Sequence, residues 1–163
     1  MTLIQIDGLS GTGKSTICQE LLRRGLRAVD ADAAFAYFGD PETGAPCQEA
    51  KRDNWIWDLR RIRQVWERSV SGVIFVCGGA MNAERCADLF SLRFLLRVDD
   101  ETMRHRLLTR RGNDYGKDPA ELEEQLALNR AARCGVDVPG WIVVDAARPL
   151  GAVVDAILGV SMR

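Results

Sequence analysis

One octapeptide constrains this chain more than any other feature: Gly8-Leu9-Ser10-Gly11-Thr12-Gly13-Lys14-Ser15. It matches the pattern Gly-x-x-x-x-Gly-Lys-Ser at every fixed position. Residues 3–6 before it read as a short buried strand, and residues 15–22 after it read as a helix that ends at Gly25. Glycines let the backbone curl, so that several N–H groups point into one hollow at the positive end of the helix. The order strand, glycine loop, helix predicts a phosphate-binding loop rather than a turn that binds nothing.

The last two residues of this loop have chemical roles of their own. A lysine in this place reaches the β- and γ-phosphates of a nucleotide, and the following serine holds Mg²⁺. Lys14 and Ser15 are therefore the first candidate site residues, and ATP and Mg²⁺ are the expected cofactors.

Composition sets the broad class. The chain has 163 residues, which suits a single domain over residues 1–163, and 22 basic against 23 acidic residues give a net charge of −1. This balance gives no general attraction to nucleic acid or membrane. Five cysteines, an odd number without a Cys-x-x-Cys pair, favour reduced thiols and a cytoplasmic location. We expect neither a signal peptide nor a membrane-spanning segment, and either a monomer or a homodimer.

Two acidic residues follow the second predicted strand, residues 26–29. Asp30 and Asp32 would lie at the carboxyl edge of an open α/β sheet, where ligands bind. Asp32 is a candidate to accept a proton from a substrate hydroxyl or to organise Mg²⁺, and Asp30 is a candidate substrate contact. Either residue can instead cap a short helix over residues 33–37.

The next strand, residues 72–77, is a continuous apolar run of the kind found at the centre of a parallel sheet. It ends in Gly78-Gly79, which allows a close approach to the backbone. No acidic residue ends this strand, so a carboxylate partner for Mg²⁺ would have to come from Asp30 or Asp32.

The segment 38–70 is expected to cover the substrate. Residues 38–51 carry several turn signals and read as a mobile loop. Residues 53–69 read as a helix with one apolar stripe. On another face, Trp57 and Arg61 are neighbours four residues apart. They either line a substrate pocket or form a surface pair, or the tryptophan is packed under the preceding loop.

A second covering segment, residues 110–118, is basic, polar and bounded by glycines. It reads as a lid over phosphates, or else as a solvated charged turn. Arg106 and Arg110 share one face of the helix that Asp99 caps, and either could stabilise a transferring phosphoryl group. A strong start signal at Asp118-Pro119 begins the next helix, and Arg130 near its end reaches the site or favours the helix C-terminus.

Strands and helices alternate through the whole chain. This predicts an α/β fold with helices on both faces of a parallel sheet. The phosphate-binding loop, the two acids and the glycine pair all follow strands, so they should gather at one edge.

These motifs resemble the small-molecule kinases of the adenylate-kinase and shikimate-kinase type. The resemblance implies a three-layer α/β/α fold with five parallel strands in the order 2-3-1-4-5, Mg²⁺-ATP as donor and a short lid. The nucleotide contacts it implies are Gly8, Ser10, Gly11, Thr12, Gly13, Lys14, Ser15, Thr16, Arg110, Arg148 and Pro149. The substrate contacts it implies are Asp30, Asp32, Arg61, Gly78, Gly79 and Arg130.

The resulting hypothesis is an ATP-dependent phosphotransferase with Lys14, Asp32, Arg106 and Arg110 as catalytic residues and Ser15 and Asp32 on the metal. The acceptor is a nucleoside, a nucleotide, or a shikimate-like or antibiotic-like hydroxyl compound. Two alternatives stay open: a kinase of polynucleotide 5′ ends, and a nucleotide-binding switch or ATPase that is not a kinase. For the switch, the sequence Asn-Lys-x-Asp that reads guanine is absent.

Overall fold

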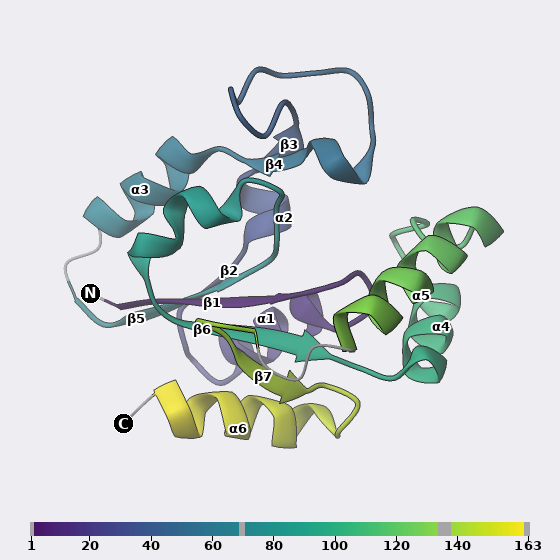
Figure 1. Ribbon diagram of the computed structural model, residues 1–163. Helices are drawn as coiled ribbons and strands as arrows, with labels where there is room; N and C mark the ends of the chain where they lie inside the picture. The colour runs from purple at the N-terminus through teal and green to yellow at the C-terminus, as the bar shows by residue number, and fades with distance from the viewer. Residues whose placement is uncertain (1, 69–70, 134–137, 162–163) are drawn as a thin grey trace.

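A five-stranded parallel sheet forms the centre of the protein, seen in a computed structural model that describes residues 2–68, 71–133 and 138–161 (Figure 1). The predictions made at Ser69 and Cys134 lie outside these residues. The strands are β1 (Thr2–Gly8), β2 (Ala28–Asp30), β5 (Val73–Cys77), β6 (Phe90–Arg97) and β7 (Ile142–Asp145). Their order is β2-β5-β1-β6-β7. Counted within this sheet, that is order 2-3-1-4-5, and the labels differ because two further short strands precede β5.

Helices cover both faces of the sheet, so the α/β class is confirmed (Figure 1). On one face lie α1 (Lys14–Arg23) and α6 (Leu150–Ser161). On the other lie α2 (Ala31–Ala34), α3 (Leu59–Arg68) and the 3₁₀ segment η2 (Ala83–Leu89). Two more helices, α4 (Asp100–Thr109) and α5 (Pro119–Arg133), stand beyond the carboxyl ends of the strands.

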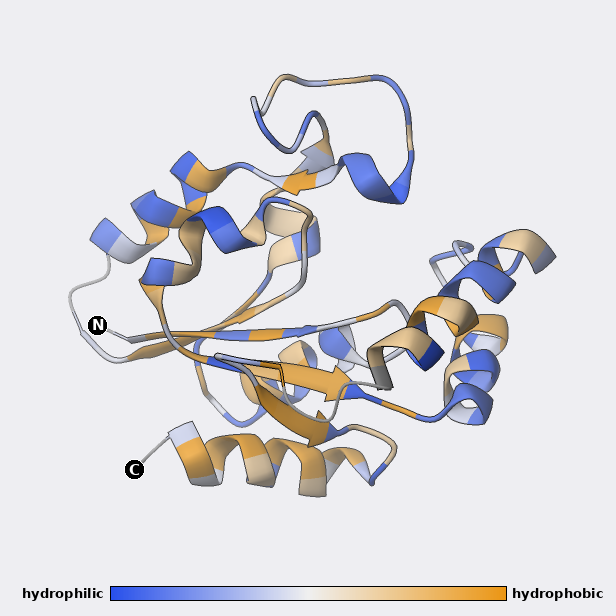
Figure 2. Cartoon of the chain, viewed as in Figure 1, coloured by the Kyte–Doolittle hydropathy of each residue, from blue (hydrophilic) through white to orange (hydrophobic). Residues whose placement is uncertain are grey.

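The core has two parts because side chains alternate along each strand. On β1, Ile4 and Ile6 pack with α1 and α6, while Leu3 packs with α2, α3 and η2. Figure 2 shows the strands of the sheet as mostly hydrophobic, whereas α3 is largely hydrophilic. Of the helices in the described residues, none has the length and apolar character to cross a bilayer.

The predicted helix over residues 53–69 is wrong in its first part. That part is a 3₁₀ turn, η1 (Arg52–Asn54), followed by a strand, β4 (Trp55–Trp57). It pairs antiparallel with β3 (Ala36–Phe38), which takes the last residues of the helix predicted at 33–37. Trp57 is 1% exposed inside the second core cluster. Pairing with a distant strand overrides the helical spacing here.

Asn82 fixes this small two-stranded sheet to the rest of the protein. It is the N-cap residue of η2, but its side chain makes no cap hydrogen bond. Its side chain accepts from the Trp57 N–H and donates to the Trp57 carbonyl, both at 2.9 Å. Asn82 is 4% exposed, so water does not reach the Trp57 N–H and carbonyl to replace these two hydrogen bonds.

Replacement of Asn82 by Ala should lower the free energy of unfolding by roughly 2–4 kcal/mol, because two buried backbone groups lose their partners. Urea unfolding measures this. The matched control is Asn54→Ala, which removes one exposed bond to the Glu49 carbonyl and should cost less than about 1 kcal/mol. Equal losses in the two variants would contradict the role given to Asn82.

Candidate active site

The octapeptide forms a tight loop between β1 and α1. Gly11 and Gly13 have φ values of +87° and +105°, a region that side chains disfavour. The Thr12 hydroxyl donates to the Leu9 carbonyl at 2.7 Å, which closes the turn from inside. Gly13 is the N-cap residue of α1 and gives no side-chain cap. The first N–H groups of α1 therefore remain available for an anion.

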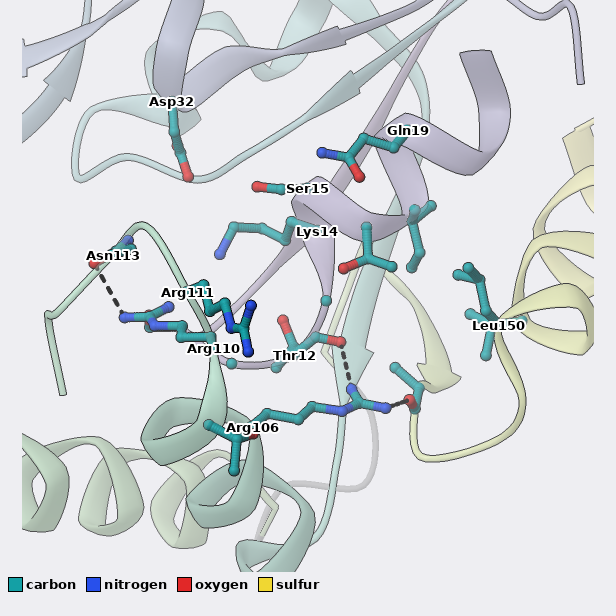
Figure 3. Close-up of a pocket in the computed structure, with 18 of the residues that line it drawn as sticks. Thr12, Lys14, Ser15, Gln19, Asp32, Arg106, Arg110, Arg111, Asn113 and Leu150 are labelled. Carbon is teal, nitrogen blue, oxygen red and sulfur yellow. Dashed lines mark hydrogen bonds between the residues drawn. The ribbon is translucent and has the colours of Figure 1, made fainter. Parts of the chain in front are cut away.

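A cavity of about 560 Å³ opens over this loop (Figure 3). Its wall carries five basic side chains and one acidic one, Asp32. The basic residues are Lys14, Arg106, Arg110, Arg111 and Arg148. This local excess of positive charge contrasts with the net charge of −1 of the whole chain. The cavity is suited to a polyanion of several phosphate groups.

The loop residues that the sequence predicted as nucleotide contacts mostly line this cavity. They are Ser10, Gly11, Thr12, Gly13, Lys14, Ser15 and Thr16. The Lys14 amino group donates to the Gly8 carbonyl at 2.6 Å and so lies across the loop. Arg148 also lines the cavity, whereas Pro149 and Gly8 do not.

The two predicted lid arginines have different surroundings. Arg106 donates to the Thr12 carbonyl at 3.1 Å and to the Ala146 carbonyl at 2.9 Å. It thereby joins α4, the loop and the segment after β7. Arg110 donates to the Ser10 hydroxyl at 3.0 Å and to the Tyr115 carbonyl, and burial lowers its pKa. Arg111, which belongs to the predicted lid 110–118, is exposed and extends toward the loop (Figure 3).

Asp32 faces Lys14 and Ser15 across the cavity (Figure 3). Burial raises its pKa, and the charge of Lys14 opposes that shift. Hydrogen bonds from the Trp55 side chain and the Gly79 N–H also favour the carboxylate. Its Oδ1 is buried without a hydrogen-bond partner in the protein. A buried carboxylate oxygen left in this way is a site for a ligand or an ion.

A third acidic residue at this edge was missed. Asp7 is half-buried near the end of β1, and its Oδ1 accepts from the Gly8 N–H at 2.6 Å. Burial raises the pKa of Asp7 to about 6; the charge of Lys14 opposes this and that of Asp32 adds to it. The sequence contained a signal for Asp7, because this acidic residue directly follows the predicted strand 3–6.

The glycine pair after β5 gives space to these carboxylates. A methyl group placed on Gly79 would lie 2.0 Å from Asp7 Oδ1, and one on Gly78 would lie 2.8 Å from Asp32 Oδ1. The sequence predicted that Gly78-Gly79 allows a close approach to the backbone, and the groups that approach it are the carboxylates of Asp7 and Asp32. Asp30, by contrast, is the N-cap of α2 and accepts from the N–H groups of Asp32 and Ala33.

Of the residues predicted as substrate contacts, Asp32 lines the cavity, whereas the other six do not: Asp30, Trp57, Arg61, Gly78, Gly79 and Arg130. Trp57 is buried in the core, and Trp55 of the same strand contacts Asp32 instead. Arg61 lines a separate, smaller pocket with Phe35 on the α3 side. Arg130 pairs with Glu123 at 2.5 Å and Asp100 at 3.6 Å. Helical spacing predicted that Trp57 and Arg61 are neighbours on one helix face. In the structure Trp57 belongs to the strand β4 and Arg61 to the helix α3, so they do not share a helix face.

The oxygen ligands at this edge fit a magnesium ion. The hydroxyl of Ser15 lines the cavity, and Asp32 offers an oxygen with no protein partner. Mg²⁺ prefers such oxygen ligands and is usually held by one or two carboxylates together with substrate phosphates.

A family model described as an AAA domain matches residues 4–127. The chain belongs to this family. No curated protein matches it as a sequence relative. Solved structures resemble it over nearly its whole length, and at these identities they establish the fold.

Three of these structures carry kinase names. A sugar kinase from Janibacter sp. HTCC2649 is 22% identical, with a TM-score of 0.63 over 98% of this chain and 93% of that chain. A shikimate kinase from Bacteroides thetaiotaomicron is 14% identical, with a TM-score of 0.66 over 99% of each chain. A deoxyadenosine kinase from M. mycoides with bound dATP is 17% identical, with a TM-score of 0.59 over 100% of each chain. The resemblance to small-molecule kinases with a phosphate-binding loop is confirmed.

Contact between Asp7 and Gly79 can be tested by a pair of substitutions. Gly79→Ala should lower the free energy of unfolding by roughly 1–3 kcal/mol, because the new methyl group overlaps the carboxylate. In an Asp7→Ala background the same change should cost almost nothing. Gly159→Ala is the control, since nothing lies within 4 Å of an added methyl group on that helical residue. A Gly79→Ala cost that Asp7→Ala leaves unchanged would refute the contact.

The raised pKa of Asp7 predicts how stability depends on pH. The folded protein holds this proton more tightly than the unfolded chain, so the stabilisation is full below about pH 4 and is lost as the pH rises through about 6. Its upper limit is about 3 kcal/mol for a shift of about two units. Without metal or nucleotide, the melting temperature of the wild type should rise relative to that of Asp7→Asn between about pH 7.5 and pH 5. Parallel curves would contradict the shift.

Proposed function

We propose that this protein is an ATP- and Mg²⁺-dependent phosphotransferase that moves the γ-phosphoryl group to a hydroxyl group of a small molecule. The observation that carries the proposal is the cavity itself: five basic side chains and the uncapped N-terminus of α1 surround a single carboxylate. Sugar, shikimate and deoxyadenosine kinases share the fold, and each name denotes an acceptor with hydroxyl groups. The acceptor of this chain belongs to that broad class.

The loop binds the triphosphate. Backbone N–H groups of residues 11–15 surround the phosphates, and Lys14 moves from the Gly8 carbonyl to the β- and γ-oxygens. The basic wall then neutralises the charge of the transferring group, with Arg110 and Arg111 on the lid side. Arg106 contributes by holding the loop, because its donors are bound to the Thr12 and Ala146 carbonyls.

Ser15 and Asp32 are the residues that would hold the metal. When bound, Mg²⁺ neutralises phosphate charge and helps to orient the γ-phosphate. Most of the acceleration in such a site comes from positioning and electrostatics rather than from covalent chemistry.

Asp32 orients the acceptor. Its carboxylate lines the cavity, accepts a hydrogen bond from the substrate hydroxyl and takes up the proton as phosphoryl transfer proceeds. The Trp55 side chain also favours the carboxylate form of Asp32. Phe38 packs edge-on against Trp55, with ring centroids 5.1 Å apart.

Screening and turnover together test the proposal. Thermal shifts are measured for sugars, nucleosides and other hydroxyl compounds in the presence of a non-hydrolysable ATP analogue, and each hit is assayed for ATP-dependent phosphorylation. Lys14→Ala should lower turnover by at least about 100-fold. Asp32→Asn should lower kcat by about 100- to 10,000-fold and still bind the analogue. Asp145→Asn is the control, because its exposed carboxylate ends β7 and accepts only from the Ala147 N–H. Full turnover by Lys14→Ala would refute the mechanism.

A further inference from the structure

We propose that Asp7 is the second magnesium-anchoring carboxylate of this site and takes the place of the acid that β5 lacks. The proposal rests on the proposed function, because it concerns the metal that accompanies the nucleotide. It assigns a role to a residue of β1 that directly precedes the phosphate-binding loop. Asp7 is a positioning residue here, which acts on the metal and its water ligands rather than on the acceptor.

The sheet order places Asp7 and Asp32 on the two sides of β5. Asp7 comes from β1 and Asp32 follows β2, and these strands are the two neighbours of β5. β5 ends in Cys77 and is followed by Gly78-Gly79, so no side chain of its own projects at that point. Both flanking acids therefore reach toward the end of β5.

The glycine contacts show how near to each other the two carboxylates lie. Asp7 Oδ1 occupies the space of a side chain on Gly79, and Asp32 Oδ1 borders the space of one on Gly78. The two glycines are consecutive, so the carboxylates lie over adjacent peptide units. An acid at the end of β5 would have to occupy this same space.

Charge explains why a cation belongs here. Two carboxylates at this range repel each other, and in the protein alone the positive charge of Lys14 acts on both. A nucleotide that draws Lys14 to its phosphates removes this compensation and adds negative charge of its own. A divalent cation between the acids and the phosphates restores the balance.

A purely structural role for Asp7 would not require a charged carboxylate. The hydrogen bond that Asp7 makes is accepted from the adjacent Gly8 N–H. A neutral amide or hydroxyl oxygen could accept it as well. Asp7→Asn keeps the shape and an acceptor oxygen and removes only the charge, so it separates the two roles.

The test measures the affinity of the full chain for a non-hydrolysable ATP analogue by calorimetry, once in EDTA and once with Mg²⁺. For Asp7→Asn we expect the metal-free affinity to equal or exceed that of the wild type, because one repulsive charge is gone. The gain in affinity on adding Mg²⁺ should fall by about tenfold or more relative to the wild type. Asp145→Asn should match the wild type in both conditions.

A second measurement uses the unaltered protein and does not depend on a variant that folds. In a crystal with Mn²⁺ and the analogue, the anomalous peak of the metal should lie within about 5 Å of the Asp7 carboxylate, the reach of one bridging water.

Three results would overturn the proposal: an unchanged Mg²⁺ gain in Asp7→Asn, an equal loss of affinity with and without metal, or a distant Mn²⁺ peak. In each case the wild type still binds the nucleotide, so the proposed function survives. Failure of the wild type to bind any nucleotide would instead overturn the proposed function, and this inference with it.

Discussion

The uncapped N-terminus of α1 imposes the main electrostatic constraint on this structure. Gly13 offers no side chain to the first N–H groups of the helix, and the preceding loop directs further backbone donors to the same point. Such groups are satisfied only by water or by an anion. The five basic side chains around them raise the cost of leaving the hollow without an anion. A cavity built in this way has its lowest free energy with a polyanion bound.

Maintaining carboxylates beside that hollow requires a special backbone. Asp7 and Asp32 approach each other only because Gly78 and Gly79 carry no side chains. The cost appears in both raised pKa values, since burial disfavours the charged forms, and a neighbouring carboxylate adds to this: Asp32 for Asp7, and Asp30 for Asp32. Groups with this kind of perturbed protonation concentrate at functional sites, because a ligand supplies the missing compensation. In the proposed function the compensation would be a cation that accompanies the nucleotide.

Local patterns predicted the parts of this structure that depend on nearby residues. The loop from Gly8 to Ser15 and the Asp99 and Asp118 helix starts follow from short-range chemistry, whereas the sheet order was implied by the resemblance to small-molecule kinases. The β3–β4 pairing does not, because its strands are separated by a long loop and Trp55–Trp57 also fits a helical stripe. Because of this error Trp57 was predicted as the aromatic residue of the site, whereas in the structure Trp55 is the tryptophan beside Asp32.

The arginines differ from the sequence prediction for another reason, which is the partners that occupy their donors. Spacing placed Arg106 and Arg110 on one helix face, but it could not show that backbone carbonyls occupy the donors of Arg106. Arg130 likewise finds acidic partners on its own helix and on α4. Asp7 was missed for a simpler reason, since the predicted strand ended one residue before it.

The contacts of the lid segment limit how it can move. Its loop is bound to the start of α5, because the Gly116 N–H donates to Glu121 at 2.7 Å and the Tyr115 hydroxyl accepts from the buried Gln125 at 3.0 Å. Arg110 binds the same loop to Ser10 at the edge of the phosphate-binding loop. These bonds favour motion of α4, the loop and α5 as one body over ordering of a loose loop. If that body closed over the cavity, the two carbonyl bonds of Arg106 would have to bend or break. An arginine that the sequence suggested for catalysis thus joins α4 to the phosphate-binding loop and to the segment after β7.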